Sequence, residues 1–198
     1  MGLVTLASGG FDSTLMSLLA QEQGITLYPL FVDYGQLGAQ REWLACRRVH
    51  AEHGLPKPRR MNLSGFGRVV PSGITNPRLR INEDAFLPGR NLLLIVVGAS
   101  YAYSVQAQGV AIGLLNPEDH LFPDQTIEFL RVAEGVVQAA IGRRLRILAP
   151  LARFTKRDVL RLAKTRRLRN VYSCHAGTEV PCGACVACVE IANAKEGR

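Results

Sequence analysis

The sequence predicts an α/β protein with a doubly wound parallel sheet of five strands. Short apolar runs alternate along the chain with longer segments whose apolar residues recur every three or four positions, and glycines or polar residues separate the two kinds. Such alternation of strands and helices is typical of a parallel sheet that helices cover on both faces. The expected strands are 3–7, 25–32, 59–63, 110–114 and 145–149.

Helices are expected between these strands. Leu15, Leu18 and Leu19 fall on one face of the first. The helix over 91–108 is apolar nearly all round, which predicts burial or packing against a second subunit, and a homodimer is the expected assembly. Residues 64–87 have no clear period and predict a long loop, a kind of segment that is usually functional or mobile. The expected helices are 12–23, 38–53, 91–108, 126–141 and 155–166, with a short one in the tail.

Length and composition limit the classes of function. The 198 residues are 47% hydrophobic, which suits one domain with an ample core. No apolar run reaches the ~20 residues that span a bilayer, and the N-terminus lacks the basic start and cleavage pattern of a secretory leader. We therefore expect a cytoplasmic protein without a membrane partner.

The net charge of +8 comes from one segment. Residues 143–169 contain eleven Lys and Arg and the single acid Asp158, which gives them a charge of +10. This segment could contact nucleic acid, an anionic partner or ATP phosphates, or form a solvated helix face. Phe154 is its only aromatic residue, so a surface that stacks on bases is not expected.

The run Ser8-Gly9-Gly10-Phe11-Asp12-Ser13 joins the first strand to the first helix. Glycines at that position let bare backbone N–H groups approach an anion at the helix N-terminus, and the serine hydroxyls add donors. The run thus predicts a nest for a pyrophosphate. The alternative is an ordinary loop in which Asp12 caps the helix. The residues expected to form the nest are Ala7, Ser8, Gly9, Gly10, Phe11, Asp12, Ser13 and Thr14.

Further polar residues follow the ends of the other expected strands or begin the helices after them. Ligands of doubly wound sheets bind at this edge. Arg90 and Lys156 supply two cations that can stabilise a departing pyrophosphate, and Asp12 is the nearest carboxylate for a Mg²⁺ ion that bridges phosphates. Asn91 and Asp124 could instead be helix caps. The remaining candidates at this edge are Phe31, Asp33, Tyr34, Gln36 and Gly113.

Four of the five cysteines lie close together near the C-terminus. Four thiolates close a tetrahedral Zn²⁺ site, which has no open position and is therefore structural. An iron–sulfur cluster uses similar spacing, whereas a reducing cytosol disfavours disulfides. His175 could replace a thiolate, but it directly follows a cysteine; Cys46 is expected in the core. We expect residues 1–170 to form the main domain and 171–198 a module packed on it. The expected ligands are Cys174, Cys182, Cys185 and Cys188.

Six motifs follow one another along the chain. They are SGGFDST, VDYGQ, LPGRN, FPD, a Thr-Lys pair before a helix, and Cys-x7-Cys-x-x-Cys-x-x-Cys. In this order they resemble the 7-cyano-7-deazaguanine synthase family of PP-loop ATP pyrophosphatases. The resemblance covers nearly the whole chain and implies a fold of the adenine nucleotide alpha-hydrolase type. It implies that ATP adenylates 7-carboxy-7-deazaguanine, that ammonia displaces AMP to give an amide, and that a second adenylation leads to the nitrile.

The resemblance also assigns roles to residues. Phe31 and Asp33 would lie beside the adenosine, and Gly113 near the nucleotide. The acceptor would meet Tyr34, Gln36, Asn91 and Asp124. The residues implied in catalysis are Ser8, Asp12, Ser13, Arg90 and Lys156.

Two departures from the family pattern keep alternatives open. Leu37 and Gly38 follow the VDYGQ motif where an Arg and a His are usual, and Gln125 and Thr126 replace a usual Cys and Arg. A paralogue found in anti-phage operons, which joins the deazaguanine to a protein amine, is the first alternative. A tRNA-modifying PP-loop enzyme and a non-catalytic nucleotide-binding scaffold are the others.

Overall fold

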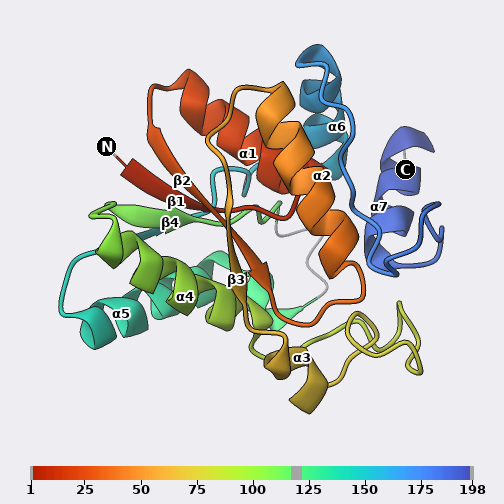
Figure 1. Cartoon of the computed structure of the whole chain (residues 1–198), viewed down its shortest axis with the longest axis horizontal. Coiled ribbons are helices and arrows are strands. Elements are labelled where there is room, and N and C mark those ends of the chain that lie inside the picture. Colours follow the sequence, from red (N-terminus) through yellow and green to blue (C-terminus); the bar gives the residue numbers. More distant parts are fainter. Residues whose placement is uncertain (1, 117–121, 197–198) are drawn as a thin grey trace.

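The computed structural model describes residues 2–116 and 122–196, and it confirms the doubly wound parallel sheet (Figure 1). The strand order is β3-β2-β1-β4-β5, and every neighbouring pair is parallel. The chain reverses its winding direction between β1 and β4, so a crevice is expected at the carboxyl ends of these two central strands. The strands are β1 Gly2–Leu6, β2 Thr26–Asp33, β3 Arg59–Asn62, β4 Gly109–Ala111 and β5 Arg146–Leu148.

Helices cover both faces of the sheet. In Figure 1, α4 and α5 lie on one face, whereas α1, α2 and α6 lie on the other, with α7 beside α6. The helices are α1 Phe11–Glu22, α2 Ala39–Glu52, α3 Gly65–Val69, α4 Arg90–Ser104, α5 Ile127–Ile141, α6 Lys156–Thr165 and α7 Val186–Glu196, with a 3-10 turn η2 at Pro123–Gln125. No helix among the described residues is long and apolar enough to cross a membrane.

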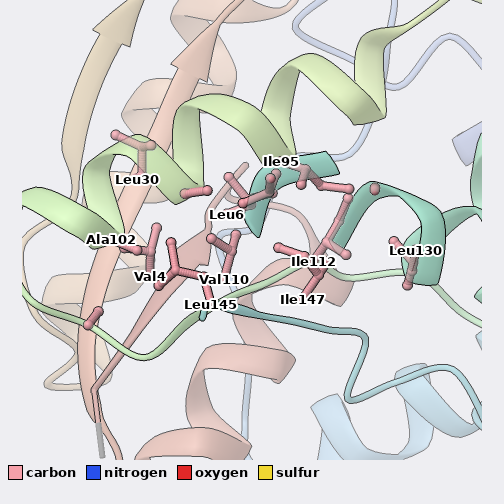
Figure 2. Packing of buried hydrophobic residues seen from close by; sticks show 14 of the residues in the cluster. Val4, Leu6, Leu30, Ile95, Ala102, Val110, Ile112, Leu130, Leu145 and Ile147 are labelled. Carbon is pink, nitrogen blue, oxygen red and sulfur yellow. The ribbon is translucent and has the colours of Figure 1, made fainter. Parts of the chain in front are cut away.

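The largest core lies between the sheet and the pair α4 and α5. Val4 and Leu6 alternate along β1 so that both point to this face, where they meet Ile95 of α4 and Val110 of β4 (Figure 2). A Cβ atom on Gly98 would lie 2.9 Å from a methyl group of Val110, so glycine lets α4 pack directly on the sheet. This close packing fixes the N-terminal end of α4 at the edge of the sheet where ligands are expected.

Most element boundaries lie within a few residues of the expectation, and the end of α4 shows why one of them differs. The helix expected to reach residue 108 ends at Ser104, because the Ala107 amide donates to the Ala102 carbonyl and the Gln106 amide to that of Tyr103. This is a Schellman ending, with Gln106 in the left-handed position at φ +57°. The sequence has no glycine at this position, so it lacks the usual signal for the end of a helix.

The segment expected to be a long loop contains a helix and a small core of its own. Helix α3 begins it, and Ile74, Ala85 and Leu87 are buried together further along. Phe122 and Val186, from distant parts of the chain, pack against this cluster. The segment is therefore an ordered wall that joins η2 and the C-terminal helix to the main domain.

Candidate functional site

A cavity of about 270 Å³ lies at the carboxyl ends of β1, β2 and β4. The cavity reaches from the loop after β1 to the start of α4 and to the C-terminal segment. Most of the residues predicted from the sequence therefore meet in one place. Those on its wall are Ala7, Ser8, Gly10, Asp12, Ser13, Phe31, Tyr34, Gln36, Arg90, Asn91, Gly113 and Lys156.

Gly9 fixes the turn that follows β1. It has a φ of +80°, and a Cβ atom there would lie 2.5 Å from the Cys46 nitrogen and 2.7 Å from the Glu42 carbonyl oxygen of α2. The Gly9 carbonyl accepts a hydrogen bond of 2.9 Å from the Tyr172 amide. Both the conformation and the contact exclude a side chain, so the loop is held between α2 and the C-terminal segment.

Two serine hydroxyls line the inner side of this loop. The Oγ atoms of Ser8 and Ser13 are 2.9 Å apart, and the Ser13 Oγ accepts from the Ser8 amide at 3.1 Å. Helix α1 begins directly after Gly10, which has no side chain to cap it. The first turn of α1 therefore keeps backbone N–H groups without an intrahelical partner, and these can donate to an anion.

Asp12 is not a helix cap, because its carboxylate binds Lys156. The Lys156 Nζ donates to both carboxylate oxygens, at 2.9 and 2.7 Å, and lies 3.4 Å from Glu190 Oε2 on α7. Burial favours the neutral amine, but the two carboxylates outweigh it and raise the pKa of Lys156. A charged ammonium therefore stands over the loop, on the first residue of α6, after Thr155, which caps that helix.

Arg90 brings the second cation to the cavity. It begins α4 after Gly89, which is left-handed, and its Nε lies 3.3 Å from the Asn91 side-chain oxygen. The side chain of Asn91 donates from Nδ2 to the Asp124 backbone carbonyl, and the backbone N–H of Asn91 donates to Asp124 Oδ2. Neither Asn91 nor Asp124 caps a helix; together they join η2 to the start of α4.

Five predicted site residues are not on the cavity wall. The Asp33 carboxylate forms an ion pair of 2.6 Å with Arg60 and accepts from the Gly35 amide, so it shapes the turn after β2. Asp124 is hydrogen-bonded to Asn91, as described above. The five residues are Gly9, Phe11, Thr14, Asp33 and Asp124.

The sequence analysis missed two acidic residues on the cavity wall. Glu42 lies in the first turn of α2 with only 9% of its surface exposed, and its Oε2 accepts from the Gln36 amide at 2.9 Å. Burial raises the pKa of Glu42 to about 7, although Gln36 and Arg90 act in the opposite direction. Glu190 comes from the tail helix. No motif marks either residue, because each reaches the cavity only through tertiary packing.

The four cysteines form a compact cluster that fits a tetrahedral metal ion. Their Sγ atoms all lie within 4.8 Å of one another, and a zinc ion with Zn–S bonds of about 2.3 Å needs sulfurs about 3.8 Å apart. The amides of His175, Cys182 and Cys185 donate to three of these sulfurs at 3.3–3.4 Å. Such N–H···S bonds stabilise thiolates.

The charges of this cluster also call for a cation. Burial, together with the neighbouring thiols Cys185 and Cys174, raises the pKa of Cys188 to about 12. Despite its burial, hydrogen bonds from backbone amides lower the pKa of Cys174, so the thiols of Cys174 and Cys188 differ, and a bound cation would favour the thiolate of Cys188 as well. His175 is not in this cluster. Its ring nitrogen Nδ1 is buried and has no hydrogen-bond partner among the described residues, and the residue lines the cavity. Cys46 is fully buried in the core, as expected.

Several side chains of the basic segment 143–169 have acidic partners. Arg161 lies 3.0 Å from Asp158, and Arg166 binds Glu22 at 2.8 Å. These exposed pairs contribute little stability, but they balance part of the local charge. The arrangement favours a solvated helix face over a nucleic-acid surface.

Comparisons with known proteins show the family of this chain. The family model described as "Queuosine biosynthesis protein QueC" matches residues 2–196. The chain belongs to this family. A 7-cyano-7-deazaguanine synthase of Desulfitobacterium hafniense is 30% identical over 93% of this chain and 84% of its own length. The synthase of Aquifex aeolicus is 27% identical over 99% of this chain and 97% of its own.

A solved structure agrees at the level of the fold. A 4-thiouridine synthetase, whose structure is an RNA complex with bound ATP, has a TM-score of 0.57 and 18% identity over 98% of this chain and 51% of its own. This chain therefore shares the doubly wound α/β fold of that structure, which is the fold type expected from the sequence. The resemblance inferred from the motifs is confirmed.

The buried Glu42 predicts a pH effect on stability. Its pKa is raised in the fold, so between pH 4.5 and 7 the folded protein holds a proton that the unfolded chain has lost. The free energy of unfolding therefore falls as the pH rises through this range, by about 3 kcal/mol. This pH-dependent loss of stability should be absent in Glu42→Gln. Urea unfolding of both proteins at pH 5 and pH 8 measures it. A difference between them that does not change with pH would contradict this assignment.

The cysteine cluster predicts that one thiolate is needed to retain a metal. Cys185→Ala should lose bound metal and lower the melting temperature by about 5 °C, because opening a closed site removes its contribution to folding. Atomic absorption and a thermal melt test this. Cys46→Ala, which removes the thiol outside the cluster, is the control and should keep its metal. Full metal content in Cys185→Ala would count against the site.

Proposed function

We propose that this QueC protein converts 7-carboxy-7-deazaguanine to 7-cyano-7-deazaguanine with two molecules of ATP. The acid's carboxylate oxygen attacks the α-phosphorus of ATP, and the bond to the β-phosphate breaks as pyrophosphate leaves. Ammonia then displaces AMP and loses a proton to give the amide. The amide oxygen then attacks the α-phosphorus of a second ATP, and a second pyrophosphate leaves. The C–O bond to that AMP breaks, AMP departs, and loss of the two N–H protons leaves the nitrile.

The meeting of a helix N-terminus with two cations carries this proposal. Ser8, Ser13 and the first amides of α1 can donate to the oxygens of a pyrophosphate, and Lys156 and Arg90 can neutralise its charge. Charge develops on pyrophosphate as the bond to the α-phosphate breaks, and fixed donors placed there lower the barrier. The family names and the ATP-containing structure with the same fold support this assignment.

The rest of the cavity suits the acceptor and the nucleoside. We assign the adenosine to the side near Phe31 and Gly113, and the acceptor to the side of Tyr34, Gln36 and Asn91. Asp33 and Asp124 act indirectly, the first through Arg60 and the second through Asn91. They position the wall rather than contact the ligand.

Two metal ions complete the proposal. A Mg²⁺ ion would balance phosphate charge, with Asp12 as its protein ligand once Lys156 turns to the phosphates. A Zn²⁺ ion would be held by the four cysteines in a structural role. That ion would fix α7 and so place Glu190 against Lys156.

A homodimer is the assembly that we propose. The outer faces of α4 and α5 leave large apolar side chains exposed, among them Val96, Tyr103, Val132 and Val136. Exposed apolar area of this kind is typical of contact surfaces. Light scattering should give twice the chain mass of 21.6 kDa. A monomer at micromolar concentration would contradict the assembly.

Loss of a polar side chain from the loop should impair the chemistry but not the fold. Asp12→Ala or Ser13→Ala should lower AMP formation from ATP and the acid by about 100-fold or more, because both residues face the ligand. Chromatography of the nucleotides measures AMP, and thermal melts check folding. Ser100→Ala, a helical serine on the exposed side of α4, is the control.

The products decide between the proposed reaction and its alternatives. A nitrile mass that depends on ammonia supports the synthase, whereas a mass gain on a partner protein would select the conjugating paralogue. AMP transfer to tRNA would select a tRNA-modifying enzyme. Tight ATP binding without AMP formation would indicate a non-catalytic nucleotide-binding scaffold. Retained turnover in either loop mutant would refute the assigned loop.

A further inference from the structure

We propose that Glu42 determines specificity for the acceptor by accepting hydrogen bonds from the ring N–H and the exocyclic amino group of a guanine-like base. This inference rests on the proposed function, because it takes a deazaguanine acid as the ligand of the cavity. It assigns a role to a buried carboxyl group that the adenylation chemistry leaves unused.

The position of Glu42 supports this role. Glu42 lines the cavity together with Gln36 and Tyr34, on the side assigned to the acceptor. In the described part of the chain, the Gln36 amide is its only hydrogen-bond partner, and it binds Oε2. Oε1 therefore keeps its lone pairs for a ligand, and Oε2 can accept once more.

Gln36 holds this carboxyl group in a fixed orientation. The Gln36 Oε1 accepts from the Tyr34 amide at 2.9 Å, and its Nε2 lies 3.4 Å from the Val32 carbonyl oxygen as well as 2.9 Å from Glu42. The side chain is thereby tied to the backbone at the end of β2. A carboxyl group oriented in this way can discriminate between ligands, because its position is set before the ligand arrives.

The chemistry of the acceptor matches that of the carboxylate. The 2-amino-4-oxopyrimidine edge of a deazaguanine presents two adjacent N–H donors, which pair with the two oxygens of one carboxylate. The edge of adenine offers one amino donor beside a ring nitrogen that carries a lone pair. This lone pair would repel the second carboxylate oxygen. Glu42 therefore suits the guanine-like acceptor and not the base of ATP.

A second group in the cavity also lacks a partner. The Nδ1 atom of His175 is buried, and no described residue hydrogen-bonds to it. His175 comes from the C-terminal segment and Glu42 from α2, yet both line the same cavity. Buried polar groups are normally satisfied, so two incompletely paired groups on one wall indicate a polar ligand between these elements.

The test compares two acids that differ by one amino group. Isothermal titration gives the dissociation constants of 7-carboxy-7-deazaguanine and of its analogue without the 2-amino group, using the full-length metal-loaded protein. The wild type should bind 7-carboxy-7-deazaguanine at least ~10-fold more tightly than the analogue, which is the scale of one good hydrogen-bonded base contact. Glu42→Gln should reduce this preference below ~3-fold.

Two controls make the comparison specific. Glu52→Gln, at the exposed end of the same helix, should keep the wild-type preference. A non-hydrolysable ATP analogue should bind all three proteins equally. If Glu42→Gln does not fold, a crystal structure of the wild type with the acid replaces it, and the 2-amino group must then lie within hydrogen-bond distance of Glu42.

The outcomes separate this inference from the proposed function. The role of Glu42 is overturned if the preference survives in Glu42→Gln, or if this variant loses affinity for the ATP analogue instead of the acid. In either case, AMP formation by the wild type still supports the synthase. A wild type that neither binds the acid nor forms AMP overturns both.

Discussion

The tight turn at Gly9 is the constraint on which the rest of the site depends. It brings the backbone against α2 at distances that leave no room for a Cβ atom, and it is tied to Tyr172 on the other side. The turn directs the start of α1 into the crevice where the sheet changes its winding direction. It places both the serine hydroxyls and the helix N-terminus, so the proposed anion site is a consequence of how β1 ends.

Charge is arranged around this turn before any nucleotide arrives. Lys156 is paired with Asp12 and Glu190, and phosphates must therefore compete with carboxylates for the ammonium. Glu190 belongs to a helix that contains Cys188, one of the four clustered cysteines. The cysteine cluster thus bears on the site through the position of this carboxylate, although none of its four cysteines lines the cavity.

The sequence predicted those parts that local patterns encode. The five strands, the loop from Ser8 to Ser13 and the cysteine cluster are each contiguous or regularly spaced, so their chemistry can be read from neighbouring residues. Arg90 and Lys156 could be placed because both begin a helix at the ligand edge. These features needed only the rule that parallel strands end together.

The remainder depends on packing that no short pattern records. Glu42 is one polar residue on a polar helix, and only the approach of α2 to the loop buries it. The carboxylate of Asp33 forms an ion pair with Arg60 on the neighbouring strand, which the motif around Asp33 does not encode. The ordered core within residues 64–87 forms because Phe122 and Val186 reach it from distant parts of the chain.

A crystal structure with a non-hydrolysable ATP analogue tests the central claim most directly. The account predicts that the β- and γ-phosphates lie within hydrogen-bond distance of the Ser8 and Ser13 hydroxyls and of the first amides of α1, with the Lys156 Nζ moved from Asp12 towards the phosphate oxygens. Phosphates bound elsewhere on the protein, with the Lys156–Asp12 pair unchanged, would contradict it.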